Sequence, residues 1–174
     1  LVVTNWFHYD CLADWYSVRV FSPAFYKILD PYIRNYTSHG CNMIYTPLFT
    51  PCLDTEVGEE RRTVQLIDVF EDEDTYTFGF EKLDRFVAFM RERGVRYFEF
   101  GHLFTQWGAE ACPKVVVRTK GGIRKKFGWK TPSDSPEYRA FLAAFLPVFT
   151  RHIEELGLKE CCFFHISDEP NEKH

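Results

Sequence analysis

The sequence lacks several features that define common protein classes. It has no uninterrupted run of 18 or more apolar residues, which predicts the absence of a transmembrane helix. No G-x-G-x-x-G pattern follows the first predicted strand, which argues against a dinucleotide-binding domain. The 21 Lys and Arg residues are outnumbered by 25 Asp and Glu residues, and the formal net charge is −4. This balance argues against a protein that binds nucleic acid or an anionic membrane surface.

Cysteine pairs of the C-x-x-C type are also absent, although the chain contains six cysteines. Without two ligands close in sequence no metal-binding knuckle is predicted, and free thiols in a reducing compartment are expected instead. The N-terminus shows neither the charged region nor the cleavage site of a signal peptide. We therefore expect a cytoplasmic rather than a secreted protein. Because the chain begins with Leu1 instead of Met, we also expect it to belong to a longer protein.

Apolar residues make up 45% of the 174 residues, enough for a single domain, residues 1–174, with a hydrophobic core. Aromatic residues are abundant, with 18 Phe, 9 Tyr and 4 Trp. Most of them must lie in the core, whereas a surplus near strand ends would suit stacking on the apolar faces of sugar rings. Composition alone does not separate these two interpretations.

One pattern occurs three times along the chain: an amphipathic helix, a glycine and a short apolar strand. Ser-Pro pairs at 22–23 and 135–136 predict the first turns of two of the helices. The internal prolines Pro31 and Pro147 should kink or interrupt them. A further strand is expected before the first helix, over residues 4–9. The expected helices are 23–39, 80–93 and 136–156, and the strands that follow them are 42–46, 97–101 and 162–166.

This alternation predicts an α/β fold with a parallel sheet covered by helices, either an open doubly wound sheet or part of a (β/α)8 barrel. Long connections follow the strands, at 47–79 and 102–135. Within them we expect an acidic, solvated segment at 68–74 and a hairpin formed by 115–119 and 123–127. Barrel enzymes build active sites from such loops, and whole barrels need about 250 residues. The sequence therefore favours half of a (β/α)8 (TIM-like) barrel, with four strands and three main helices.

Polar side chains gather where the predicted strands end. The strongest pattern is Asp168-Glu169, two adjacent carboxylates that follow an apolar strand and precede Pro170. Two neighbouring carboxylates are costly to desolvate, and their repulsion favours the protonated form that a general acid needs at neutral pH. The alternative is a solvated turn in which both acids face water. The other polar residues at strand ends are His8, Asp10, Tyr45, Thr46, His102, Gln106 and His165.

At these residues the sequence resembles a known family. The segment 164–170, Phe-His-Ile-Ser-Asp-Glu-Pro, is similar to the catalytic motif of glycoside hydrolase family 123. Supporting similarities lie in segments 5–14, 45–51 and 101–109, in the same order along the chain. The resemblance extends over essentially the whole sequence, and it implies that the chain is the first half of that family's catalytic barrel.

The resemblance implies an N-acetyl-β-galactosaminidase that acts on a glycan or glycolipid by a retaining, substrate-assisted route, in a bacterium. The substrate's own 2-acetamido oxygen would attack the anomeric carbon, so no enzyme nucleophile and no cofactor or metal ion is required. In the family pattern Glu169 matches the general acid/base. Asp168 matches the residue that orients the acetamido N–H and stabilises its developing charge.

Neighbouring residues of a strand face opposite ways, so Asp168 and Glu169 reach one pocket only if strand pairing ends at Asp168. Pro170 makes such a break plausible, because it cannot donate to a ladder. The same alternation predicts that His165 faces the barrel interior and that Phe164 faces the helices.

Further residues are candidates for contact with the sugar, although each also has a structural interpretation. Histidines at strand ends are commonly satisfied structural residues, and an exposed tryptophan can be a stacking wall or a loop anchor. Glu99, in the middle of a strand, is a polar group that needs a partner when buried. The candidates for substrate contact are His102, Gln106, His165, Trp107, His8 and Asp10.

Two alternative functions remain at this stage. A metal-dependent hydrolase on the same barrel would use histidines and acids at the strand ends, but the sequence lacks the His-x-His or His-Glu-x-x-His spacing of such sites. A non-catalytic carbohydrate-binding barrel would keep the fold without turnover. Half a barrel exposes strand edges and an apolar interior, so we expect the isolated chain to be inactive and to self-associate. The metal alternative would draw on His8, Asp10, His102, His165 and Asp168.

Overall fold

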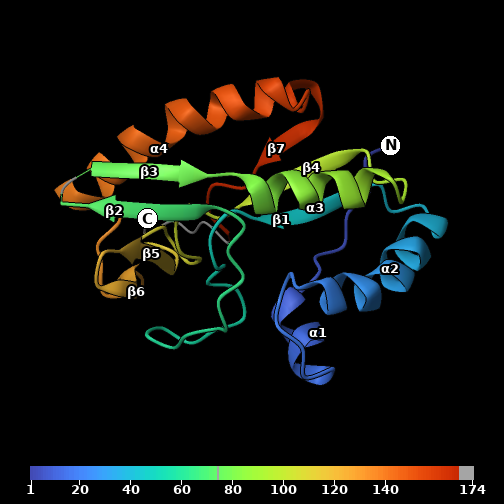
Figure 1. The fold of residues 1–174 in the computed structure, drawn as a ribbon, viewed down its shortest axis with the longest axis horizontal. Coiled ribbons are helices and arrows are strands. Elements are labelled where there is room, and N and C mark those ends of the chain that lie inside the picture. The colour runs from blue at the N-terminus through green and yellow to red at the C-terminus, as the bar shows by residue number, and fades with distance from the viewer. Residues whose placement is uncertain (74, 169–174) are drawn as a thin grey trace.

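Two small β-sheets carry the fold of residues 1–73 and 75–168, the part of the chain that the computed structural model describes (Figure 1). The first sheet is parallel and has the strand order β1-β4-β7. Its strands are β1 (Met43–Pro47), β4 (Tyr97–Gly101) and β7 (Cys162–Phe164).

The second sheet has the order β3-β2-β5-β6. The pairs β2–β3 and β5–β6 are antiparallel hairpins, and β2 joins β5 in parallel. The predicted hairpin in the second long connection is therefore confirmed as β5–β6. The strands are β2 (Asp68–Asp72), β3 (Thr75–Gly79), β5 (Val115–Thr119) and β6 (Gly122–Phe127).

Four α-helices accompany the sheets, and serine caps begin two of them. The side chains of Ser22 and Ser135 accept hydrogen bonds from the backbone amides of Phe25 (3.2 Å) and Tyr138 (3.3 Å). A proline follows each of these serines, at a helical position where its missing N–H costs nothing. The helices are α1 (Tyr9–Trp15), α2 (Pro23–Ser38), α3 (Glu81–Arg91) and α4 (Pro136–Glu155), and a 3₁₀ turn, η1 (Lys159–Cys161), precedes β7.

The two faces of the parallel sheet differ in chemistry. On one face Phe100 and Phe164 contact the ring of Phe149 in α4, at centroid distances of 5.1 and 6.0 Å. The other face carries Tyr45 and Glu99, which the register of β1 and β4 places side by side. Successive side chains of a strand alternate between faces, so helix α4 covers an apolar face and leaves a polar one opposite.

Helix α4 joins the two sheets through a row of phenylalanines spaced four residues apart. Phe141, Phe145 and Phe149 are fully buried, and successive rings stack at 6.0 and 5.1 Å. Phe145 also lies 5.1 Å from Phe78 of β3, whereas Phe149 contacts the parallel sheet. Figure 1 shows α4 running along β3 toward β7. Residues four apart share one helix face, so this single stripe forms the centre of the core.

The strand predicted over residues 4–9 is wrong. Only Thr4 makes a bridge, to Met43, and Tyr9 is already the first residue of α1. Side chains rather than a ladder fix this segment: the amide of Asn5 donates to the Tyr36 hydroxyl (2.8 Å). Within the part of the chain that the structure describes, the parallel sheet therefore has three strands instead of four, and there are four α-helices instead of three.

The acidic segment at 68–74 is not a solvated loop but includes β2. Its alternating burial places Val69 and Glu71 inside. The Glu71 carboxylate is paired with Arg124 (2.6 Å) and Lys126 (2.8 Å) of β6. These two cations, distant in sequence, neutralise the charge that made the segment look solvated.

The prolines inside α2 and α4 do not interrupt them. Pro31 and Pro147 both lie on exposed positions of continuous helices. A proline removes one backbone hydrogen bond from the helix, and on an exposed face water can satisfy the carbonyl that is left without a donor. The other predicted helices and strands are confirmed within a few residues at their ends.

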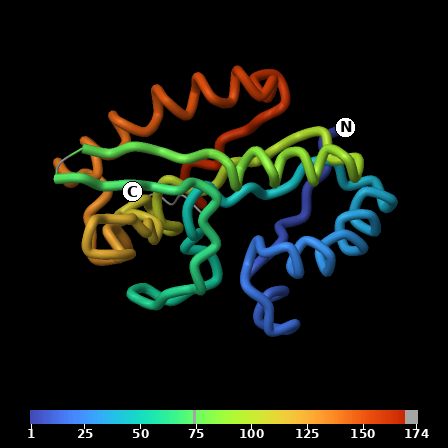
Figure 2. The backbone as a smooth tube through the Cα atoms, in the orientation of Figure 1, coloured from blue at the N-terminus to red at the C-terminus, as the bar shows by residue number. Residues whose placement is uncertain are grey.

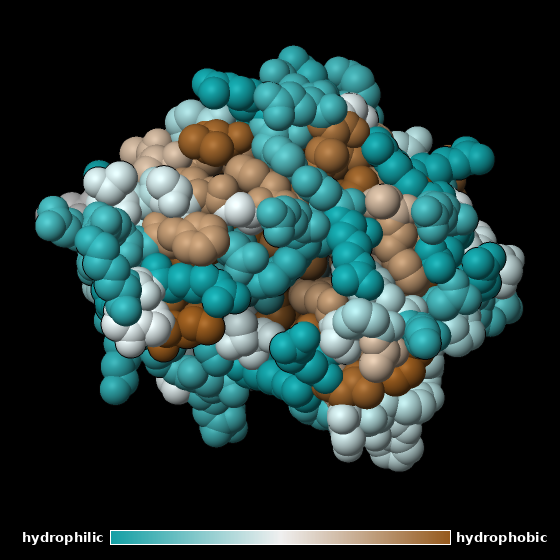
Figure 3. Space-filling model, in the orientation of Figure 1, coloured by the Kyte–Doolittle hydropathy of each residue, from teal (hydrophilic) through white to brown (hydrophobic). Residues whose placement is uncertain are grey.

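Apolar patches interrupt the mostly polar surface in the face that Figure 3 shows. Among the described residues, three exposed apolar side chains lie on or next to β7: Phe163, Phe164 and Ile166 are 45%, 41% and 51% exposed. Strand β7 has β4 as its one neighbour within the described sheet. No described helix is both long and apolar enough to cross a membrane.

We expect the 174-residue chain, studied by itself, to self-associate along β7, because an exposed strand edge flanked by apolar side chains is a template for pairing. Small-angle scattering over a concentration series should give a mass above 20.6 kDa. The variant Phe163→Lys should reduce it, whereas Val148→Lys, at an exposed position of α4, should not. A monodisperse monomer would contradict this expectation.

Candidate functional site

A chain of polar contacts lies at the carboxyl end of the parallel sheet. The imidazole of His165 places Nδ1 2.8 Å from Glu99 Oε1. The second oxygen of Glu99 accepts a hydrogen bond from Trp6 Nε1 (3.1 Å). His165 is itself fixed by its backbone amide, which donates to the Phe100 carbonyl (2.8 Å). His165 therefore lies on the polar face of the sheet, as the strand alternation predicts.

The other ring nitrogen of His165 faces the first of the two predicted acids. His165 Nε2 lies 3.7 Å from Asp168 Oδ1. The imidazole thus has a carboxylate beside each nitrogen, Glu99 in the sheet and Asp168 beyond it. In its protonated form such a ring donates from both nitrogens and places a positive charge next to Asp168.

Asp168 is also held through the backbone of the loop that follows β4. The amide of Trp107 donates to the Asp168 carbonyl (3.1 Å). The neighbouring Ser167 hydroxyl donates to the Thr105 carbonyl (3.2 Å). In the same loop Gln106 is buried and its amide nitrogen lies 3.5 Å from the Thr55 carbonyl. The loops after β1 and β4 therefore meet beside Asp168.

His102 lies behind this chain rather than at its surface. The ring is fully buried, its Nδ1 is 3.1 Å from the Tyr45 hydroxyl, and its centroid is 4.2 Å from that of His165. Burial, and secondly the charge of His165, lowers the pKa of His102 to about 3. Among the described residues its Nε2 has no hydrogen-bond partner. His102 is a neutral ring that supports Tyr45 and His165.

Tyr45 reaches His102 by lying across Gly101. A Cβ at position 101 would come within 2.3 Å of Tyr45 Cε2, so only glycine fits beneath the ring. Burial raises the pKa of Tyr45 well above its ordinary value, which keeps the hydroxyl protonated. The Tyr45 carbonyl in turn accepts from the hydroxyl of Tyr9 in α1 (2.8 Å).

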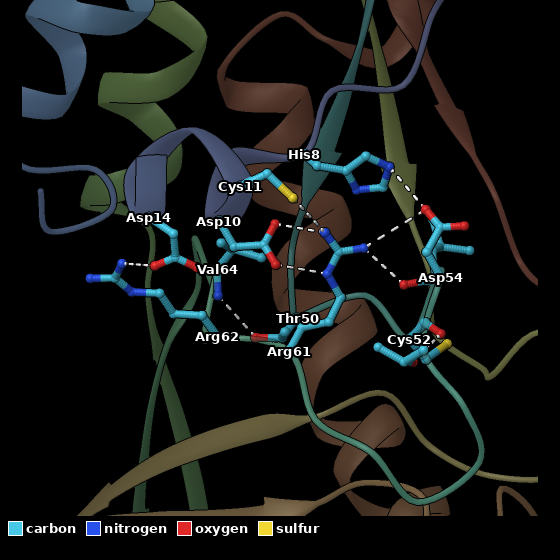
Figure 4. Close-up of polar contacts among 12 residues, drawn as sticks. His8, Asp10, Cys11, Asp14, Thr50, Cys52, Asp54, Arg61, Arg62 and Val64 are labelled. Carbon is cyan, nitrogen blue, oxygen red and sulfur yellow. Dashed lines mark hydrogen bonds and ion pairs between the residues drawn. The ribbon is translucent and has the colours of Figure 1, made fainter. Parts of the chain in front are cut away.

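The predicted candidates His8 and Asp10 belong to a different cluster (Figure 4). Asp10 accepts two hydrogen bonds from one guanidinium, Arg61 Nε (2.7 Å) and Nη2 (2.8 Å), and both side chains are 9% exposed. Arg61 Nη1 also donates to the Leu53 carbonyl (2.8 Å). His8 Nε2 pairs with Asp54 at 3.2 Å. Burial, and secondly Arg61, lowers the pKa of His8.

This cluster fixes the long connection after β1. Figure 2 shows segment 48–67 on the same side of the parallel sheet as α1, and the Asp10–Arg61 ion pair joins them. Arg61 was not among the predicted site residues, because its partner lies 51 residues earlier and no local pattern connects the two. Trp6, which donates to Glu99, was missed for the same reason.

The structure thus divides the predicted site residues into two groups. The first consists of Asp168 and four residues around or behind it, and the second consists of two residues that hold the loop near α1. Glu169 lies outside the described residues. Within residues 1–73 and 75–168, no three His, Cys, Asp or Glu side chains are arranged so that they could hold one metal ion. The first group is Asp168, His165, His102, Gln106 and Trp107, and the second is His8 and Asp10.

Comparisons with known proteins agree with the resemblance found in the sequence. The family model described as glycoside hydrolase 123, catalytic domain, matches residues 6–174. Among solved structures, a family 123 glycoside hydrolase from Clostridium perfringens, reported with the details of glycolipid glycan hydrolysis, aligns with a TM-score of 0.68 and 14% identity. The alignment covers 91% of this chain and 28% of that chain, so this chain spans less than a third of its structural relative. No curated protein matches the sequence.

We expect Asp10→Asn to lower the free energy of unfolding by about 3 kcal/mol, because it removes the carboxylate bonded to the buried Arg61 guanidinium and leaves it the 76% exposed Asp54, at 4.0 Å, as an acidic partner. Asp14→Asn is a matched control on the same helix: the Asp14–Arg62 pair has side chains 61% and 41% exposed. Its loss should cost less than about 1 kcal/mol. Urea denaturation of both variants tests the difference. Equal decreases in the free energy of unfolding would show that burial of the Asp10–Arg61 pair adds nothing to stability.

The neutral state of His102 predicts a pH dependence of stability. Its folded pKa of about 3 lies below its ordinary 6.5, so between these values the unfolded chain binds a proton that the folded chain does not. The free energy of unfolding should therefore fall as the pH drops below about 6.5. In His102→Phe this contribution is removed, and the decrease between pH 6.5 and 5 should be shallower by urea denaturation. The lowered pKa of His8 acts in the same direction in both proteins and cancels in the comparison. Identical slopes would contradict the burial of a neutral His102.

Proposed function

The chain belongs to glycoside hydrolase family 123, and we propose that it carries the acidic pair for the retaining, substrate-assisted cleavage of terminal N-acetyl-β-galactosaminides from a glycan or glycolipid. One observation supports this most directly. The side chain of Asp168 lies beside His165 at the carboxyl end of a parallel sheet, where two long loops converge. This is the edge at which parallel α/β folds place their chemistry.

The proposed reaction proceeds in two steps. In the first, the acetamido oxygen of the substrate attacks the anomeric carbon while Glu169 gives its proton to the departing glycosidic oxygen, and an oxazolinium forms. In the second, Glu169 as carboxylate takes a proton from water, whose oxygen attacks the anomeric carbon and reopens the ring with retained configuration. The role of Glu169 comes from its place in the family motif.

Asp168 would accept a hydrogen bond from the acetamido N–H and stabilise the positive charge that develops there. A carboxylate in this role must be held in one orientation, because a displacement of about 1 Å from the productive position lowers the reaction rate strongly. The imidazole of His165, 3.7 Å away, and the backbone contact with Trp107 support such a restraint. Glu99 and Trp6 in turn hold His165.

We assign contact with the sugar to three residues close to Asp168, namely His165, Gln106 and Trp107. Trp107 is 42% exposed, whereas Gln106 is buried beside it in the same loop. The fully buried His102 would act through Tyr45 and His165, and Asp10 through its pairing with Arg61. Direct contact with the sugar thus falls to three residues, whereas His102 acts from behind them and Asp10 from a separate cluster.

The architecture of the whole site is also a proposal. We take residues 1–174 as one domain whose parallel sheet is the first part of a (β/α)8 barrel, with the remaining strands continuing from the β7 edge. The similarity to one third or less of a family 123 structure supports this view. The isolated chain would then lack one wall of the site and show no turnover.

The direct test uses the full-length protein and an aryl N-acetyl-β-galactosaminide. Because Glu169→Gln removes the transferable proton and Asp168→Asn removes the charge that faces the acetamido group, each should lower kcat by about 10²- to 10⁴-fold. The surface variants Glu155→Gln and Asp134→Asn are matched controls at exposed positions and should retain activity.

Two further substrates separate the proposal from its alternatives. The plain galactoside, which cannot form an oxazoline, should be inert, whereas the gluco epimer reports selectivity at the 4-position. Cleavage of the plain galactoside at a similar rate would mean an enzyme nucleophile and would overturn substrate assistance. Binding of these sugars without hydrolysis would favour a carbohydrate-binding role. Loss of activity with a chelator, restored by a divalent metal, would favour a metal-dependent hydrolase.

A further inference from the structure

A cavity lies next to the loop that holds Asp168. It has a volume of about 180 Å³ and is formed by the loops after β1 and β4 together with the segment after β6. Val57, Gln106, Trp107, Trp129 and Lys130 are among the residues that line it. Neither Trp129 nor Lys130 belongs to the acidic motif or to the contacts around His165.

Trp107 connects this cavity to Asp168. Its backbone amide touches the Asp168 carbonyl (3.1 Å), and the residue itself lines the cavity. Its φ of +64° is in the left-handed region, followed by +115° at Gly108 and +59° at Ala109. Non-glycine residues rarely adopt this conformation, and such strain concentrates at functional sites. The strain therefore falls on the residue that lines the cavity and also donates a backbone hydrogen bond to Asp168.

The lining of the cavity matches one sugar ring. Two indoles supply broad apolar surfaces, which fit the C–H faces of a pyranose, and Gln106 and Lys130 carry groups that can meet hydroxyls. Sites for drug-sized ligands measure roughly 300–1,000 Å³. At about 180 Å³ the cavity has room for a single ring rather than an extended chain.

We infer that this cavity binds the sugar unit from which the terminal N-acetylgalactosamine is cleaved, with Trp129 as its stacking wall. The inference rests on the proposed function, which puts the acetamido group of the terminal sugar against Asp168, on the side of His165 and Glu99. Neither of those two residues lines the cavity, so it is a separate compartment. The leaving sugar reaches it across Trp107.

A pair of substrates isolates this role in the full-length protein. In N-acetyl-β-galactosaminyl fluoride the leaving group is too small to occupy a sugar pocket. In a disaccharide of N-acetylgalactosamine β-linked to galactose, the leaving group is a sugar that can occupy it. Because an aromatic stacking contact is worth about 0.5–1.5 kcal/mol, Trp129→Ala should lower kcat/KM for the disaccharide roughly two- to twelvefold more than for the fluoride. Trp129→Phe, which keeps a flat ring, should restore part of the difference.

Trp15→Ala is the matched control, since Trp15 is 82% exposed on α1 and lies outside both the cavity and the acidic site. This variant should leave kcat/KM unchanged for both substrates. Equal losses on fluoride and disaccharide in Trp129→Ala would overturn the inference and indicate a general structural role for the indole.

A binding measurement separates this inference from the proposed function. Titration with methyl β-galactoside should change the intrinsic tryptophan fluorescence of the wild type, and the change should be lost in Trp129→Ala. If the wild type hydrolyses neither substrate but shows this response, the proposed function fails and the sugar pocket stands. If no response occurs and the disaccharide shows no selective loss, the pocket is not a sugar site.

Discussion

Burying the carboxylate of Glu99 on the central strand of the parallel sheet is unfavourable unless both of its oxygens are paired. Trp6 and His165 provide those partners, one from before α1 and one from after β7. The N-terminal segment and the end of β7 are thereby drawn to the same strand from opposite ends of the chain. His165 satisfies Glu99 with one nitrogen and faces Asp168 with the other. The position of Asp168 thus depends on the buried carboxylate of Glu99, which reaches it through His165.

A second set of contacts restrains Asp168 from the loop side. Trp107 and Thr105 bond to the segment of Asp168, and Gln106 reaches the carbonyl of Thr55. The loop that contains Thr55 is in turn fixed to α1 by Arg61 and Asp10. These contacts run continuously from α1 to Asp168, although each joins residues about 50 or more positions apart. Buried and fully paired charges of this kind specify one arrangement of loops that would otherwise have several.

Much of this fold could be predicted from the sequence, because helix periodicity, serine caps and glycine stops are local signals. The errors occurred where distant partners decide the outcome. Residues 4–9 look like a strand by composition, but Tyr36 binds Asn5 and α1 begins at Tyr9. The acidic segment looks solvated until Arg124 and Lys126 pair with Glu71. The family motif located Asp168 through residue identity alone, whereas Trp6, Arg61 and Trp129 carry no local signal and could be found only in three dimensions.

The two kinds of acid in this molecule show why pairing and accessibility have to be judged together. Asp10 is nearly buried, and both of its carboxylate oxygens accept hydrogen bonds from one edge of the Arg61 guanidinium, so it has little capacity left for a ligand. Among the described residues, the Asp168 carboxylate faces one imidazole nitrogen at 3.7 Å, longer than a direct hydrogen bond, and a carboxylate has several acceptor positions. It is oriented without being fully occupied. The role proposed for Asp168, which is to hold an acetamido N–H in one step and release it in the next, needs this combination of orientation and free acceptor positions. Asp10 is also an aspartate, but it does not have this combination.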